Sequence, residues 1–265
     1  MAKPTPLSAA KISLTAFNEV LGRYPACIQA ISQDKGEIAK PGQKTLAELD
    51  EYRYDEAVKA FGPEKAGTKS MGVDEVKTLV EWKLRHGKFR PTLMKLVSSN
   101  DPDLVQSTVQ DAIKQYRDKS DISGALGILT KLKGIGPATA SLLLAVHDPD
   151  HVIFFADEAF YWLCGGGKKV PLKYNVKEYD TLCEKSRALS QRLGVKAIDI
   201  ERVAFVLMRQ ESGDVAAASA TLDPEPSVSS VAKVTPPKTK RKTTDDDTNE
   251  PERPVRRSKR TKHSS

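Results

Sequence analysis

The chain has 265 residues, of which 39% are hydrophobic, so it is long enough to bury one substantial core. Lys and Arg outnumber Asp and Glu by 42 to 35, and the resulting formal charge of +7 favours polyanions as partners. The first residues lack the apolar core of a signal peptide and the longest apolar runs are too short for a membrane span, so we expect a soluble, intracellular protein without membrane contact. A monomer is the expected state, although no feature of the sequence determines it.

Metal chemistry is not indicated by the sequence. Cys27, Cys164 and Cys183 are far apart and form no CxxC pair, and the four histidines show no zinc-ligand spacing. We therefore expect reduced thiols and no metal site.

Helical patterns recur along the chain. Apolar residues after Asp74 have helical spacing until Gly87, and Asp101 followed by Pro102 is typical of a helix N-terminus. Further patterns cover 179–193 and 200–207, and no stretch alternates apolar and polar residues long enough to indicate a strand. The prediction is an all-α domain over residues 1–212, with eight to ten helices around one core.

A helical hairpin is predicted over residues 122–147. Asp121 can cap a first helix with one apolar face, and the second helix, 139–147, is apolar nearly all round. Between them, Gly134 and Gly136 can bring the backbone close to a ligand and Ile135 can fill the space between the helices. Unpaired N–H groups at the start of the second helix suit a phosphate. The residues expected to contact nucleic acid are Lys131, Lys133, Gly134, Ile135, Gly136 and Thr139.

The string Leu-Lys-Gly-Ile-Gly-Pro-Ala-Thr-Ala between two apolar helices resembles the hairpin of the helix-hairpin-helix DNA glycosylase superfamily. An ordinary tight turn between helices is the alternative. The resemblance covers mainly residues 120–165. It implies duplex DNA as the partner and a monovalent cation at the hairpin, as found in family members, with no other cofactor required.

Asp157 stands at the separation from the hairpin at which this family carries its catalytic aspartate. In the family members that act on alkylated bases, the catalytic aspartate is followed by a second acidic residue, and the Asp157-Glu158 pair resembles that arrangement. A carboxylate in a dry pocket stabilises the positive charge that develops on the sugar when a base is released. The alternative is a plain helix N-cap, because Asp157 precedes a helical pattern.

Aromatic side chains would be needed to stack on an extruded base. The pocket candidates besides Asp157 are Glu158, Tyr161, Trp162, Trp82 and Tyr54, although aromatics at helical spacing are more often core. The basic and aromatic segment 82–91 could contact phosphates, but a solvated helix end is the favoured interpretation. Gly165-Gly-Gly-Lys168 lacks the spacing of a phosphate loop and is expected to be a connector.

Ala138 occupies the position at which strand-cutting members of the family carry a Schiff-base lysine, so the resemblance implies base release without lyase activity. The first hypothesis is thus a monofunctional DNA glycosylase. The second is a non-catalytic binding module in chromatin or repair assemblies, and the third is a helical protein whose hairpin contacts only other proteins.

Residues 213–265 change to Ala, Ser, Thr, Pro, Lys and Asp, which predicts a disordered basic tail. Two basic clusters in it indicate either nuclear import, with an import receptor as partner and a nuclear location, or loose binding to a polyanion. The alternative is a solubilising tail without a receptor. The candidate import residues are Lys238, Lys240, Arg241, Lys242, Arg256, Arg257, Lys259 and Arg260.

Overall fold

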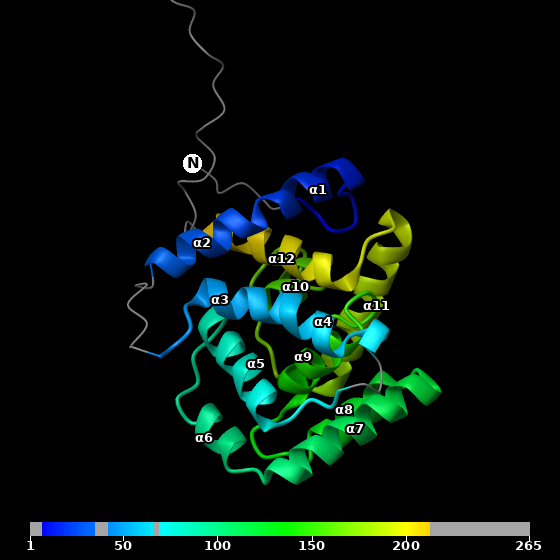
Figure 1. The fold of residues 1–265 in the computed structure, drawn as a ribbon. Coiled ribbons are helices and arrows are strands. Elements are labelled where there is room, and N and C mark those ends of the chain that lie inside the picture. The colour runs from blue at the N-terminus through cyan, green and yellow to red at the C-terminus, as the bar shows by residue number, and fades with distance from the viewer. Residues whose placement is uncertain (1–6, 35–41, 66–68, 213–265) are drawn as a thin grey trace, which may run out of the picture. The chain divides into compact units, whose positions relative to one another are not determined.

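The computed structural model describes residues 7–34, 42–65 and 69–212, which form an all-α fold without strands (Figure 1). These ranges contain twelve α-helices rather than the expected eight to ten. The difference arises from helices of five or six residues, α3, α4 and α6, which are too short to show an amphipathic repeat.

The helices are α1 (Leu14–Gly22), α2 (Tyr24–Asp34), α3 (Leu46–Glu51), α4 (Ala57–Phe61), α5 (Val73–His86), α6 (Leu93–Ser98), α7 (Pro102–Lys119), α8 (Ile122–Leu129), α9 (Pro137–His147), α10 (Asp157–Leu163), α11 (Val176–Leu193) and α12 (Ala197–Ser212). A π-helical turn, Tyr52–Glu56, joins α3 to α4, and a 3₁₀ turn, Pro63–Lys65, follows α4.

Helix ends form where the sequence places capping residues. The Asp101 carboxylate accepts hydrogen bonds from the amides of Asp103 and Leu104 at 3.0 Å each, and Asp121 accepts one from the Gly124 amide at 2.8 Å. Gly194 ends α11 in the left-handed conformation, with φ of 69°. These contacts confirm the predicted boundaries, because each satisfies backbone groups that a helix end leaves unpaired.

Helix α9 forms the centre of the core. Every residue from Ala138 to His147 is buried, as its apolar sequence predicts, and α4, α5 and α8 pack around it (Figure 1). Helix α12 contacts α1, α2, α10 and α11, so both ends of the described chain belong to the same part of the fold. Helix α7 lies along α8.

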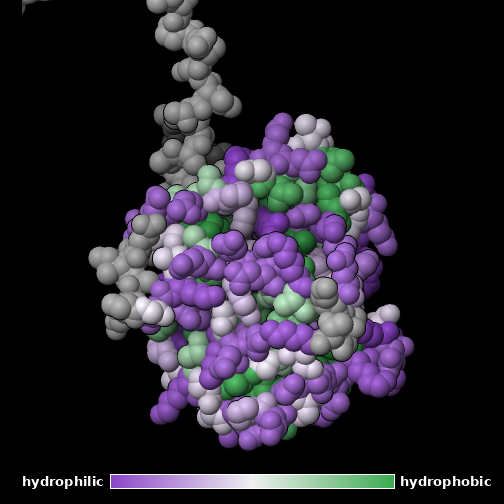
Figure 2. Space-filling model, viewed as in Figure 1, coloured by the Kyte–Doolittle hydropathy of each residue, from purple (hydrophilic) through white to green (hydrophobic). Residues whose placement is uncertain are grey.

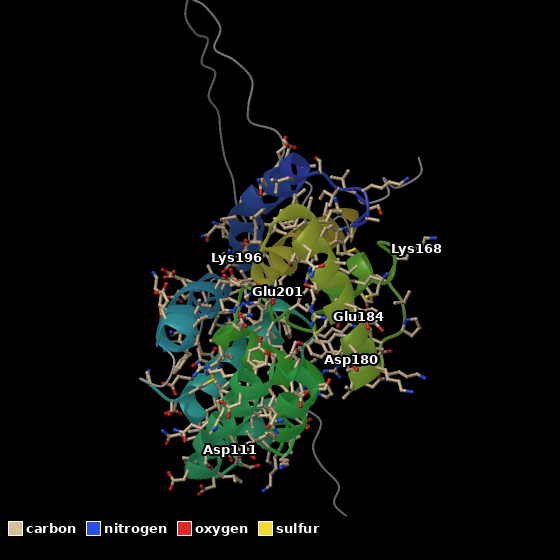
Figure 3. All side chains as sticks on the ribbon, turned by 90° about the vertical axis from the view of Figure 1, so that its right-hand side faces the viewer. Asp111, Lys168, Asp180, Glu184, Lys196 and Glu201 are labelled. Carbon is tan, nitrogen blue, oxygen red and sulfur yellow. The ribbon has the colours of Figure 1, made fainter. Side chains whose placement is uncertain are left out.

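A buried ion pair joins two distant segments of this core. Arg53, on the π-helical turn, lies 3.4 Å from Glu201 of α12, and both side chains are almost fully buried. Figure 3 shows Glu201 within the interior, whereas Lys168 extends outward from the connector after α10. The lysine of the Gly-rich segment therefore points to solvent.

The face of the molecule seen in Figure 2 is mostly hydrophilic, with a small hydrophobic group toward the end where α1 lies. None of the helices in the described ranges combines the length and the apolar character that a membrane span needs. The predicted tail, 213–265, and its candidate import residues lie outside the described residues.

Candidate active site

A cleft of about 270 Å³ opens beside the first turn of α10. Its walls come from segments far apart in the sequence: the end of α5 with the loop after it, the start of α9, residues 154–158, the 169–174 connector and the end of α12. We call it the Asp157 cleft. Five cationic side chains line it, namely Lys83, Lys88, Arg90, Lys169 and Arg209, against two carboxylates, Asp157 and Glu158.

Asp157 faces this cleft and does not cap α10. Ala156 occupies the N-cap position, where no side-chain capping bond forms. The Asp157 Oδ2 atom lies 2.8 Å from Lys88 Nζ, and Oδ1 accepts a 2.7 Å hydrogen bond from the Tyr174 hydroxyl. With 17% of its side chain exposed, the carboxylate is accessible from the cleft yet held in one orientation.

The segment that leads into Asp157 is fixed by two buried side chains. The Phe154 amide donates to Glu201 Oε1 at 2.6 Å, and the Phe155 amide donates to the Ser141 hydroxyl at 2.9 Å. Because Glu201 belongs to α12 and Ser141 to α9, both helices position the Asp157 backbone. Neither contact was predictable from the sequence, since each joins residues that no local pattern connects.

The partners of Asp157 are held in defined protonation states. The hydrogen bond to Asp157 raises the pKa of Lys88, which stays an ammonium ion. Burial, together with the bond to Asp157, raises the pKa of Tyr174 to about 12, so its hydroxyl stays a donor. Tyr174 has a φ of 54°, which is costly for a residue with a Cβ.

Two further cations shape the electrostatics. Burial lowers the pKa of Lys83 to about 8, and the positive charge of Arg90 contributes in the same direction. The Arg90 guanidinium lies 5.4 Å from the centre of the Tyr174 ring. Lys83, Lys88 and Arg90 all belong to the segment 82–91. Residues 87–91 are exposed, as the favoured interpretation of a solvated helix end expects, and the segment also forms part of the wall of the cleft.

Glu158 is the second carboxylate of the cleft, and its side chain is 17% exposed, like that of Asp157. Its carboxylate is 3.5 Å from Arg209 Nη2, an atom that also donates to the His86 carbonyl. Burial raises the pKa of Glu158, and the charge of Arg209 opposes that shift. The Glu158 carboxylate and the Arg209 guanidinium thus provide an acceptor and donors in the lining of the cleft.

Only one of the four aromatic candidates lines the cleft. Tyr161 does, but Trp82 is fully buried and donates from Nε1 to Asp50 at 2.9 Å. Trp162 donates to the Leu7 carbonyl at 2.7 Å, and Tyr54 packs edge-on against Trp82. These three side chains form part of the core, as aromatics at helical spacing often do.

The turn between α8 and α9, residues 130–136, exposes Lys131, Lys133 and Gly136. Gly134 has a φ of +79°, and a Cβ there would lie 3.0 Å from side-chain atoms of Leu96 and Val97. Glycine is therefore required at 134 for packing against α6. At Gly136, the N-cap of α9, φ is −90° and a Cβ would meet nothing within 4 Å.

The Asn100 side chain holds this turn in place. Its Oδ1 accepts from the Lys133 amide at 2.8 Å, and its Nδ2 donates to the Lys133 carbonyl at 2.9 Å. The Ile135 amide donates to the Leu132 carbonyl, whereas the amides of Gly134 and Gly136 donate to none of the described residues. Nothing in the sequence pointed to Asn100, because the contact spans 33 residues.

Two of the expected nucleic-acid contacts are internal. Ile135 is 3% exposed, as expected for a residue that fills the space between α8 and α9. Thr139 is also 3% exposed, so its side chain cannot reach a ligand at the turn, contrary to the expectation from its position. Ala138, two residues after Gly136, lines the Asp157 cleft and so connects the turn with the site.

Comparison of the chain with protein-family models, with curated protein sequences and with solved structures finds no match. Within the described ranges, no group of three or more His, Cys, Asp or Glu side chains is arranged to hold a metal ion.

Proposed function

We propose that the chain binds duplex DNA through a helix-hairpin-helix at 122–147 and hydrolyses the N-glycosidic bond of damaged, alkylated bases without cutting the strand. The observation that carries the proposal is the Asp157 carboxylate, 17% exposed, in the wall of a predominantly cationic cleft. The cleft also includes Ala138, in the first turn of the helix that the hairpin glycines precede.

The chemistry follows from the charges in the cleft. Loss of a base leaves positive charge on the sugar, and a fixed carboxylate such as Asp157 stabilises that charge or activates the attacking water. Lys88 forms an ion pair with Asp157 in the free protein. When DNA is bound, the Lys88 ammonium group contacts a phosphate instead, because the phosphate is a second anionic partner for it. Ala138 carries no amine, which supports hydrolysis by water rather than a Schiff base at that position.

Binding is supported by the turn at 130–136. Two amide groups without acceptors among the described residues, those of Gly134 and Gly136, adjoin the exposed Lys131 and Lys133. Such an arrangement suits a phosphate oxygen. The monovalent cation implied by the family resemblance would bind carbonyl oxygens of the same turn, of which those of Leu132 and Lys133 already accept one bond each. No step of the proposed reaction uses it.

The test is base release by the full chain and by Asp157→Asn from duplexes that carry methylated, ethenylated or deaminated bases, measured by chromatography of the freed base. We expect Asp157→Asn to lose about 100-fold or more in rate, with duplex affinity nearly unchanged. Asp111→Asn is the matched control, because Asp111 is an exposed carboxylate of α7 at the lower end of the molecule in Figure 3. Equal rates for wild type and Asp157→Asn would refute the catalytic role.

A non-catalytic binding module is the second candidate. The ion pair between Lys88 and Asp157 favours this candidate, since the Lys88 ammonium group balances the charge of the Asp157 carboxylate in the free protein. This candidate predicts salt-dependent duplex binding and no base release from any lesion. A hairpin that contacts only protein predicts no salt-sensitive DNA binding at all.

A nuclear location is also proposed, on the composition of 213–265 alone. Fluorescence microscopy of the full chain, with the cluster at 238–242 or the cluster at 256–260 changed to Ala, would test it. Nuclear accumulation that survives loss of both clusters would contradict an import role for the tail.

A further inference from the structure

A second cavity, of about 310 Å³, lies between α4, α7 and the end of α9, and none of the described residues that line it belongs to the Asp157 cleft. Its volume falls in the range of about 300–1,000 Å³ that is typical of small-molecule sites. We call it the His147 pocket, because His147, the last residue of α9, belongs to its lining. Its apolar wall consists of the buried side chains of Phe61, Met71, Val109 and Ile113.

The two ring nitrogens of His147 have different surroundings. Nδ1 lies 2.9 Å from the Leu143 carbonyl oxygen, which can only accept, so Nδ1 carries the proton. Burial lowers the pKa of His147 to about 4, so the ring is neutral at about pH 7 and Nε2 is left as an acceptor. Nε2 has no hydrogen-bond partner among the described residues, although His147 is only 7% exposed.

This unpaired nitrogen points to a ligand. A buried polar atom without a partner costs free energy, and folded proteins leave few such atoms unsatisfied. Among the described residues, the side-chain atoms that are both fully enclosed and unpaired belong to Arg53 and Arg202, so Nε2 keeps an accessible surface. Because His147 lines the pocket, a ligand there can reach Nε2, and it must present an N–H or O–H donor.

The charged residues of the pocket define the other end of the ligand. The described lining includes three cations, Lys69, Lys114 and Arg117, against one carboxylate, Asp118. Asp118 pairs with Lys114, and Lys69 pairs with Glu75, in contacts that are largely exposed and therefore weak. The exposed Arg117 forms no ion pair with any described residue. Its guanidinium suits an anionic group, which it can bind through two parallel hydrogen bonds.

We propose that the His147 pocket binds a mononucleotide. The base donates an N–H group to His147 Nε2, the base and sugar contact the apolar wall, and the phosphate pairs with Arg117. A phosphate monoester, with about two negative charges at about pH 7, matches the excess of cations better than a carboxylate does. The inference goes beyond the proposed function and does not depend on any role of Asp157.

The experiment titrates the full chain with dGMP, deoxyguanosine, inorganic phosphate and indole-3-acetate, by isothermal calorimetry. We expect dGMP to bind about tenfold or more tightly than each of the other three, because it engages His147 and the cations together. Equal binding of inorganic phosphate would reduce the pocket to an anion site. Indole-3-acetate carries a ring, an N–H group and a carboxylate, so equal binding of this compound would overturn the assignment to a nucleotide.

Variants locate the bound nucleotide. Arg117→Gln should weaken dGMP about tenfold and leave deoxyguanosine unchanged. Lys119→Gln, on the same helix but outside the pocket, is the matched control and should bind dGMP as wild type does. His147→Phe keeps an aromatic ring without the acceptor and should weaken both ligands about tenfold. Since residues 117 and 119 are exposed, the first comparison holds even where His147→Phe fails to fold.

Nitrogen NMR of the imidazole rings tests the central contact directly. The His147 Nε2 resonance should shift when dGMP is added to the full chain, because Nε2 then accepts a hydrogen bond, whereas the resonances of the exposed His151 should stay in place. An unchanged Nε2 resonance at saturating dGMP would refute the proposal, since the nucleotide would then be bound elsewhere. None of these measurements requires base release, so a failure of the glycosylase would leave them as they are.

Discussion

Lys88 and Asp157 form an ion pair with 2.8 Å between Nζ and Oδ2, which joins the loop after α5 to the first residue of α10. Lys88 is 65% exposed, so the pair adds little to folding stability, within about 1 kcal/mol. Its importance is electrostatic, because it sets which charge the cleft presents before a ligand arrives.

The first prediction concerns Lys88→Gln. If Lys88 moves to a phosphate when DNA binds, the variant should bind duplex more weakly and its salt dependence should fall by about one phosphate contact. Base release at saturating enzyme should change less than about tenfold, in contrast to Asp157→Asn. Single-turnover kinetics at several salt concentrations would measure both effects. A fall in the saturated rate with unchanged affinity would place Lys88 in the chemical step.

The second prediction separates the two glycines of the turn. Gly136→Asp meets no steric obstacle and adds a favourable N-cap, so stability should hold or rise while the new charge lowers duplex affinity about tenfold or more. Gly22→Asp, an equally open position at the end of α1, should leave affinity unchanged. Anisotropy titrations with a labelled duplex would compare them. Equal affinities for both variants would remove the turn from the DNA contact.

The third prediction concerns Asn100→Ala. The change leaves the partly buried amide and carbonyl of Lys133 without their side-chain partner, so the free energy of unfolding should fall by about 1–3 kcal/mol. Urea denaturation would measure the loss. Asn100→Asp tests the two hydrogen bonds separately. The Asp carboxylate can accept from the Lys133 amide but cannot donate to the Lys133 carbonyl. A stability equal to that of wild type in both variants would contradict the role of Asn100 in holding the turn.

Residues close in sequence were predictable, and contacts between distant residues were not. The helix starts at Asp101 and Asp121 were predictable, because a capping side chain bonds to backbone amides in the first turn of its own helix. Asp157 was singled out by the family resemblance, through its separation from the glycine turn, and the structure places it in the lining of a cleft. Its partners Lys88 and Tyr174 were missed, since they come from the loop after α5 and from the 169–174 connector, and no periodicity encodes contacts between such distant segments.

The burial of the aromatic side chains was likewise not predictable from the sequence. Trp82 and Trp162 fit a stacking pocket by residue type, yet their burial depends on which helix face meets the core. The sequence pattern could not decide between the two environments, because both favour large apolar rings. The exposure of Phe89 was equally invisible for the same reason.

The fourth prediction concerns Asp50, whose carboxylate accepts bonds from Trp82 Nε1 and the Tyr24 hydroxyl. Burial raises its pKa to about 6, although these bonds and the nearby Arg202 and Arg53 favour the charged form. Between about pH 4 and pH 6 the native state holds a proton that the unfolded chain has released, so this group's contribution to stability falls as the pH rises.

Asp50→Asn removes that contribution. The stability of the variant relative to wild type should therefore be more favourable at pH 7 than at pH 4, by about 1–3 kcal/mol. Urea denaturation of both proteins across this range would measure the difference. The contributions of the other titrating groups are the same in both proteins and cancel. Parallel curves would show that Asp50 titrates normally in the folded protein.

The fifth prediction concerns the pH dependence of DNA binding. Lys83 lines the Asp157 cleft, and burial lowers its pKa to about 8, so it is charged at about pH 7 and mostly neutral at about pH 9. The pKa of Lys88 is raised by its bond to Asp157, so Lys88 keeps its charge over this range. Of Lys83 and Lys88, Lys83 is thus the one whose charge changes over this range.

Duplex affinity should therefore fall as the pH rises from about 7 to 9, and the salt dependence of binding should decrease by about one phosphate contact. Lys83→Arg should abolish the change, because a guanidinium keeps its charge, whereas Lys88→Arg should leave it as in wild type. Anisotropy titrations at several salt concentrations and at both pH values would provide the slopes. If wild type and Lys83→Arg lose affinity equally with pH, Lys83 is not the titrating cation, because the arginine at 83 cannot release its proton in this range.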